Sequence, residues 1–147
     1  MVIGEAPGRD EDEGGEPFIG RSGRLLFSLI AEEVGVARDA CFVTNVVKCR
    51  PPGNRTPRPD EISACRAWLL GQFADVRPRC VLAVGATAVR EVLGLVGSMG
   101  SVHGEVVAMG AVPGVGTYHP AAALRTPSLV DVMRADLRVV RALVEPT

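Results

Sequence analysis

Polar side chains that could exchange protons or hydrogen-bond a planar ligand stand directly after short apolar segments of the chain. Glu5 and Glu11 follow the first such segment, Asn45 follows the second and His119 follows the last. Carboxylates and imidazole groups act as acids or bases, and a carboxamide offers both a donor and an acceptor. Taken singly, each residue has an ordinary structural reading, as a solvated acid, a turn cap or a packed histidine. Their joint appearance after apolar segments indicates a site.

The apolar spacing along the chain predicts the strands and helices that position these residues. Short apolar segments bounded by Gly and Pro predict strands at residues 1–3, 40–44, 81–84 and 112–118, with a weaker candidate at 105–109. Apolar residues at helical spacing predict helices at residues 22–34, 62–76, 88–93 and 130–144. Ser22 is the expected N-cap of the first helix, and Gly35 is its expected stop.

This alternation predicts an α/β fold. We expect a three-layer sandwich with a central, mostly parallel four-stranded sheet and helices on both faces. Ligands of such sheets bind at the carboxyl ends of the strands. The loops that follow the strands are therefore the expected site, at residues 4–18, 45–59, 85–88 and 119–127.

The composition is that of a globular protein and leaves its partner open. The chain has 147 residues, of which 47% are apolar and 22% charged, and its formal net charge is -1. This charge argues against a large surface for wrapping nucleic acid and leaves room for a small basic patch. With no apolar run long enough for a bilayer and no export signal, we expect one cytoplasmic, monomeric domain over residues 1–147.

Three sequence blocks, in this order along the chain, resemble the motifs of family 4 uracil-DNA glycosylases, the iron–sulfur type. They are GEAPG at residues 4–8 with GEPFIG at 15–20, TNVVKCRPP at 44–52, and HPAAALRTP at 119–127. The resemblance implies hydrolysis of the bond between uracil and deoxyribose in DNA, which leaves an abasic site for base excision repair. Such enzymes extrude the target nucleotide from the base stack into a pocket.

The resemblance also implies roles for single residues in the uracil pocket. Phe18 would lie against the flipped ring beside Ala6, and Asn45 would pair with uracil O4 and N3–H, which cytosine cannot match. His119 would stabilise the negative charge that collects near uracil O2 as the bond breaks. Glu5 would position water or backbone, and Glu11 would lie near uracil C5.

The last motif implies contacts with the DNA duplex. Leu124 would act as a wedge, with helix packing as an equally weighted alternative, and Arg125 would contact a phosphate.

Other family groups carry a water-orienting acid where this chain has Ala6, which leaves the general base open. His103 is interpreted as a solvated turn residue.

The cysteines depart from the family pattern. Cys49 and Cys65 match two of the four ligands of the family's [4Fe–4S] cluster, whereas Cys41 and Cys80 are interpreted as core thiols of buried strands. The other two ligands come from a segment before the first strand, so we expect an N-terminally truncated chain. Such a chain would lack the cluster and fold with marginal stability.

Two alternative functions remain. The first is a catalytically weak or inactive nucleic-acid-binding relative of the same fold, favoured by Ala6 and the missing cysteines. The second is a general α/β nucleotide-binding protein whose turn at residues 4–8 holds a phosphate. The second alternative does not explain Asn45, the block at residues 44–52 and His119 together.

Overall fold

A five-stranded sheet in the order β2-β1-β3-β5-β4 lies at the centre of the computed structural model, which describes residues 1–146. All neighbouring strands are parallel except β4 and β5, which are antiparallel. The strands are β1 (Val2–Gly4), β2 (Val43–Asn45), β3 (Val81–Val84), β4 (Val106–Met109) and β5 (Val112–Thr117). From β1 the chain continues to β2 on one side of it and then to β3 on the other side. The strand order therefore reverses between β1 and β3, and open α/β sheets bind ligands at such a point.

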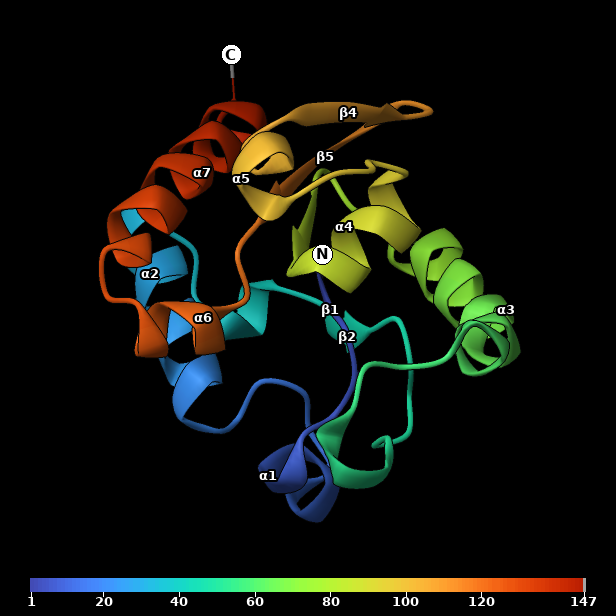
Figure 1. The fold of residues 1–147 in the computed structure, drawn as a ribbon. Coiled ribbons are helices and arrows are strands. Elements are labelled where there is room, and N and C mark those ends of the chain that lie inside the picture. Colours follow the sequence, from blue (N-terminus) through green and yellow to red (C-terminus); the bar gives the residue numbers. More distant parts are fainter. Residues whose placement is uncertain (147) are drawn as a thin grey trace.

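Helices cover both faces of this sheet (Figure 1). The helices α2 (Arg21–Glu33), α6 (Pro120–Arg125) and α7 (Leu129–Val144) pack together on one face. On the other face α4 (Ala86–Leu93) contacts β1, β3 and β5, and α3 (Pro59–Val76) lies beyond it. The remaining helices are short, namely α1 (Arg9–Gly14), α5 (Met99–Val102) and the 3-10 turns η1 (Arg38–Ala40) and η2 (Pro52–Asn54).

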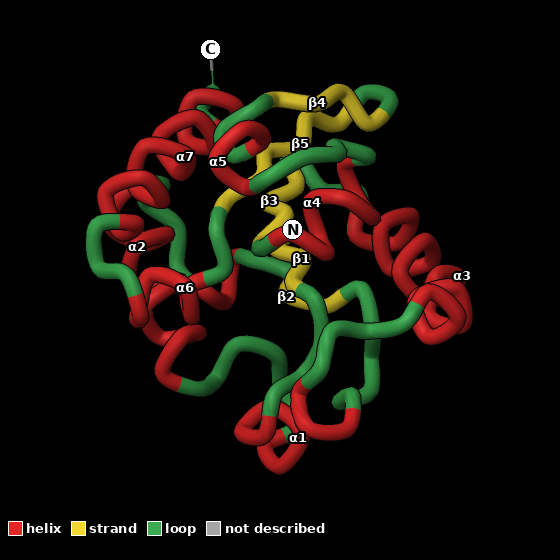
Figure 2. Tube along the Cα trace, in the orientation of Figure 1, coloured by secondary structure: helices red, strands yellow, loops and turns green. Residues whose placement is uncertain are grey.

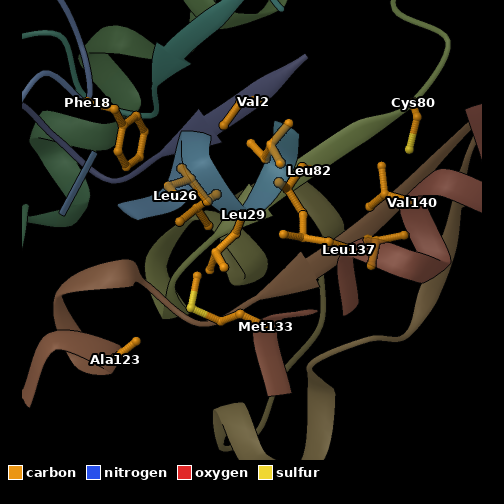
Figure 3. Packing of buried hydrophobic residues seen from close by; sticks show 13 residues of the cluster. Val2, Phe18, Leu26, Leu29, Cys80, Leu82, Ala123, Met133, Leu137 and Val140 are labelled. Carbon is orange, nitrogen blue, oxygen red and sulfur yellow. The ribbon is translucent and has the colours of Figure 1, made fainter. Parts of the chain in front are cut away.

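Alternate strand residues divide the core into two clusters, one on each face of the sheet. In β3, Leu82 and Val84 face the cluster that contains α2 and α7, and Val81 and Ala83 face the other. Figure 3 shows Leu26 and Leu29 of α2 against Leu82, with Met133 and Leu137 of α7 beside them. Because β3 is buried on both faces, its sequence is continuously apolar rather than alternating.

The predicted layers and the mostly parallel sheet are confirmed, but the expected strand number is wrong. The sheet has five strands rather than four, because the weak candidate at residues 105–109 forms β4. This strand pairs antiparallel with β5 at the sheet edge, where half-exposed positions weaken an apolar signal. Among residues 1–146, no helix combines the length and apolar character needed to cross a membrane.

Two local expectations are also wrong. The segment 40–44 is not one strand, because Cys41 N–H closes a 3-10 turn on Arg38 O at 3.0 Å and β2 begins only at Val43. Cys41 is therefore only partly buried, unlike Cys80, which is a core thiol as expected.

The first long helix begins earlier than its sequence indicates. Its N-cap is Gly20 rather than Ser22, because the Gly20 carbonyl already accepts Arg24 N–H at 2.9 Å. Gly35 ends the helix as expected: its φ is 80°, and its N–H donates a hydrogen bond to the Ile30 carbonyl. Because of this hydrogen bond between Arg24 and Gly20, the N-cap of the helix lies two residues before the predicted position.

The helix α3 is less firmly packed than its apolar spacing predicts. Ile62 is buried and Leu69 and Phe73 are partly buried against the sheet, as the spacing indicates. On the outer side, however, Trp68 and Leu70 expose 70% and 62% of their surface. The apolar residues of α3 therefore lie on more than one side of the helix.

The core on the α7 face gives a direct test of the fold. Leu137 is fully buried, so we expect Leu137→Ala to lower the free energy of unfolding by about 2–5 kcal/mol through lost burial and a cavity. Leu70→Ala, on the exposed side of α3, should change it by less than about 0.5 kcal/mol. Urea unfolding of the two variants checks this, and equal losses would contradict the packing described.

Candidate active site

A pocket of about 550 Å³ lies at the carboxyl ends of the four parallel strands. In Figure 2 the loops that follow β1 and β2 lead from this end of the sheet towards α1. It is lined by Glu5 after β1, Asn45 at the end of β2, Gly85 after β3 and His119 after β5. The predicted convergence of Glu5, Glu11, Asn45 and His119 is therefore observed. Its volume is in the range of pockets that hold small ligands.

The carboxamide of Asn45 is held in the pocket wall and left open to a ligand. Asn45 is only 6% exposed, and its backbone carbonyl, not its side chain, accepts a hydrogen bond from Lys48 Nζ at 2.5 Å. Lys48 Nζ also donates to Thr44 Oγ1 at 2.7 Å and to Gln72 Oε1 at 2.8 Å. Among residues 1–146 the carboxamide itself has no hydrogen-bond partner, and neither its nitrogen nor its oxygen is fully buried. Its donor and acceptor are therefore available to a bound molecule.

Gly4 makes room for the two flat groups of this wall. In β1 it lies opposite Asn45, and a Cβ at Gly4 would come within 2.6 Å of Asn45 Oδ1. The same atom would come within 2.4 Å of Phe18 Cζ. Any side chain at residue 4 would thus displace the carboxamide or the aromatic ring.

His119 is held as a neutral hydrogen-bond donor. It is the N-cap of α6, and its Nδ1 accepts the N–H of Ala121 at 3.0 Å. Since Nδ1 is an acceptor, the ring proton of neutral His119 is on Nε2. Burial lowers the pKa of His119 below the ordinary 6.5, and Arg125 adds to this, whereas Glu5 and Glu11 oppose it. Burial and the backbone hydrogen bond both favour the neutral ring.

Phe18 and Gly85 enclose this imidazole. The rings of Phe18 and His119 lie 6.0 Å apart with a tilt of 31°. Gly85 has φ of 89°, and a Cβ there would come within 3.2 Å of His119 Cβ. Phe18 is 7% exposed and lines the pocket.

The two carboxylates are used differently. Thr87 Oγ1 donates to Glu5 Oε2 at 2.5 Å, which fixes the carboxylate at the pocket floor and leaves Oε1 without a protein partner among residues 1–146. Glu11 instead accepts three backbone N–H groups, from Gly8 and Ile19 at 3.1 Å and from Gly20 at 2.9 Å. Both Glu11 oxygens are engaged in folding the loop, which favours a positioning role.

Residues at the pocket mouth come from two loops. Arg125 is exposed and lines the pocket, and Leu124 beside it is partly buried and in neither core cluster. Asn54, with φ of 55°, and Arg55 line the opposite side. The pairing of Arg55 with Glu61, at 2.6 Å, lowers the pKa of Glu61 to about 2.

The sequence does not single out Thr87, although the loop that contains it, residues 85–88, is among those expected to form the site. Its hydroxyl reaches Glu5 from a helix far along the chain. No local spacing reports such a contact. Ala6 lines the pocket as predicted and offers no acid.

His103 is not a solvated turn residue. Its Nδ1 lies 2.9 Å from Asp136 Oδ1, and Thr117 Oγ1 donates to the other Asp136 oxygen at 2.8 Å. Asp136 is buried on α7, so its two contacts join the loop after α5 and the end of β5 to this helix. The sequence gave no local signal for this long-range pair.

The residues present do not fit an iron–sulfur cluster by themselves. Cys49 is exposed, and the partly buried Cys65 accepts Lys48 N–H on its Sγ at 3.5 Å. Residues 1–146 hold no group of three or more His, Cys, Asp or Glu side chains that could bind a metal ion. A [4Fe–4S] cluster is held by four thiolates. These residues supply two at most.

The chain matches the sequence model of the Uracil DNA glycosylase superfamily over residues 1–141. It is 42% identical to a type-4 uracil-DNA glycosylase of Pyrobaculum aerophilum over 146 residues, 93% of this chain and 74% of the relative. The type-4 uracil-DNA glycosylase of Sulfurisphaera tokodaii is 39% identical, over 97% of this chain and 69% of that protein.

The relative from Thermotoga maritima, also named a type-4 uracil-DNA glycosylase, is 42% identical over 87% of this chain and 67% of its own length. These matches agree with the pocket, in which the three motif blocks come together. They confirm the resemblance inferred from those blocks. The chain thus belongs to the uracil DNA glycosylase superfamily and, within it, to the type-4 group.

Proposed function

We propose that this protein is a uracil-DNA glycosylase that hydrolyses the N-glycosidic bond of a flipped-out deoxyuridine in DNA and leaves an abasic site. The observation that carries the proposal is the pairing, in one pocket, of an unpartnered Asn45 carboxamide with a neutral His119 imidazole. The type-4 relatives support the same activity. We expect the protein to act in base excision repair, as a monomer in the cytoplasm.

Asn45 would recognise the base by its edge. Its amide N–H would donate to uracil O4 and its carbonyl would accept uracil N3–H. Cytosine presents an acceptor at N3 and an amine at C4, so both contacts would be lost and polar groups left unpaired. Phe18 would stack on the ring, and Ala6 would line the pocket beside it. Recognition then rests on one carboxamide.

His119 would stabilise the leaving group. As the bond between C1′ and N1 breaks, its electron pair moves into the uracil ring, and the Nε2–H would donate to uracil O2. A preorganised donor of this kind is worth about 3 to 4 kcal/mol in the transition state. Because the ring is neutral, no proton transfer from His119 is required for this interaction.

Water would then add to C1′ on the sugar face of the site, and the proton that it loses would neutralise the released uracil anion. Glu5, oriented by Thr87, would hold that water through its free Oε1. Glu11 would keep the loop that carries Phe18 in place through its three hydrogen bonds. Leu124 would enter the duplex as a wedge, and Arg125 would contact a phosphate.

Cys49 and Cys65 remain our candidates for two ligands of a [4Fe–4S] cluster. The other two thiolates would have to come from outside the described residues. No step of the reaction proposed above passes through such a cluster.

A weak or inactive nucleic-acid-binding relative is the second candidate function. Ala6 favours it, because the pocket lacks an acid at that position. Tight binding of uracil-containing DNA without any abasic product would select this candidate.

Substitution of the two central residues tests the proposal. His119→Ala should lower kcat for uracil release about 10²–10³-fold, because an oxyanion donor is lost. Asn45→Ala should lower kcat/KM by a comparable factor and weaken discrimination against cytosine. Release of uracil from a labelled oligonucleotide measures both. His103→Gln, outside the pocket, is the control, and unchanged activity in both pocket variants would refute the assignment.

Arg125 gives a prediction on DNA binding. If it contacts a phosphate, Arg125→Ala should weaken binding of uracil-containing and uracil-free duplexes equally, and should reduce the slope of log K against log salt by about 1. Fluorescence anisotropy at several salt concentrations measures this slope. An exposed arginine away from the pocket, Arg79, provides the control. An unchanged slope in Arg125→Ala would exclude the phosphate contact.

The lowered pKa of His119 predicts how stability depends on pH. Between the ordinary value of 6.5 and the lower folded value, the unfolded chain binds a proton that the folded protein does not. The contribution is therefore fully present above pH 6.5 and is lost as the pH falls towards the folded pKa. NMR titration should place the His119 pKa below 6.5, and His119→Asn should remove this part of the pH dependence in urea unfolding. A titration at or above 6.5 would contradict the buried, neutral ring.

A further inference from the structure

Phe18 has a backbone conformation that a bulky residue rarely adopts. Its φ is 55°, in the left-handed region, and its ring is nearly buried. Among non-glycine residues Asn tolerates this region best, whereas an aromatic residue there is strained. Such strain persists only where the surrounding structure holds the residue firmly. Something must therefore hold the peptide at Phe18.

Arg38 makes the contacts that hold it. Its Nη1 donates to the carbonyl of Phe18 at 2.8 Å, and its Nη2 donates to the carbonyl of Pro17. The guanidinium carbon lies 4.5 Å from the centre of the Phe27 ring on α2. A planar, forked cation that stacks on an aromatic ring is well suited to fix two carbonyls at once. Arg38 lies in η1, twenty residues along the chain from Phe18.

The space beside the same peptide is limited by a glycine of α2. A Cβ at Gly23 would come within 2.0 Å of the Phe18 carbonyl oxygen. The Phe18 ring lies against Gly4 at one edge and 6.0 Å from the His119 ring. The Phe18 backbone is thus confined between Arg38 and Gly23, and its ring between β1 and His119.

We infer that Arg38 is a positioning residue for Phe18: by binding the carbonyls of Pro17 and Phe18, it keeps the ring in place as a preformed surface for the flipped base. The inference rests on the proposed function, since it deepens the role of Phe18 in that site. Arg38 itself does not line the pocket. Its effect on catalysis acts through the aromatic ring, because misplacing a positioning group by about 1 Å can cost about 10²-fold in rate.

The first experiment compares two arginines that contact the same loop. Arg38→Met leaves an unbranched apolar side chain beside Phe27 but removes the guanidinium and both of its hydrogen bonds, and should lower kcat/KM for uracil release about 30-fold. Arg38→Lys keeps one donor and should recover part of this loss. The control is Arg24→Met, because the exposed Arg24 side chain donates to the Ile19 carbonyl, at 3.3 Å, and to no other group among residues 1–146. Equal activity of Arg38→Met and Arg24→Met would overturn the inference.

A double-mutant cycle separates positioning from a general structural effect. If Arg38 acts through Phe18, Arg38→Met should cost less than about 3-fold when Phe18 is already alanine. A full further loss in the Phe18→Ala background would mean that Arg38 acts elsewhere, and would overturn the inference. Assays are run well below the unfolding temperature of each variant.

Amide exchange provides a readout that needs no activity. The N–H groups of Ile19 and Gly20, both bonded to Glu11, should exchange about 10-fold faster in Arg38→Met and unchanged in Arg24→Met. Unchanged protection in Arg38→Met would overturn the inference. If the unsubstituted chain released no uracil, the proposed function would fail, and the exchange data would still decide the role of Arg38.

Discussion

Gly4 lies at the carboxyl end of β1, between the strands that carry the rest of the site, and its lack of a side chain makes the pocket possible. The Asn45 carboxamide and the Phe18 ring both approach its Cα more closely than a Cβ would allow. The Asn45 carboxamide and the Phe18 ring therefore both border Gly4 in the wall of one pocket. The three-dimensional site therefore depends on a steric constraint at a single backbone position.

His119 is a neutral hydrogen-bond donor in the pocket in spite of the two carboxylates near it. His119 is kept neutral by burial and by the Ala121 N–H, although Glu5 and Glu11 favour its protonation. The carboxylate of Glu11 is engaged by three backbone N–H groups, and that of Glu5 by the Thr87 hydroxyl. The Nε2–H donor of His119 therefore belongs to an uncharged ring that the Ala121 N–H holds in place before a ligand arrives.

The loop between β1 and α2 shows how contacts distant in sequence are combined. Glu11, which belongs to the loop, accepts hydrogen bonds from backbone N–H groups of the loop. Arg38, which lies outside the loop, donates hydrogen bonds to carbonyl groups of the loop. Because Gly23 of α2 has no side chain, the Phe18 carbonyl can lie close to the helix backbone while it accepts the Arg38 hydrogen bond. These contacts hold the loop as part of the pocket wall, on both sides of the short helix α1.

The amino-acid sequence by itself determined the alternation of strands and helices, the order of the motif blocks and the polar residues at the strand ends. These depend on local spacing, as in the wholly apolar segment 81–84, which became β3. Local spacing failed where a single turn or an edge position decided the outcome, as at Cys41 and β4. Only the tertiary structure decided the tautomer of His119, the partners of Glu11, Thr87 and His103, and the contact of Arg38 with Phe18. These properties depend on how close atoms from separate elements come to one another, and periodicity along one chain does not encode that distance.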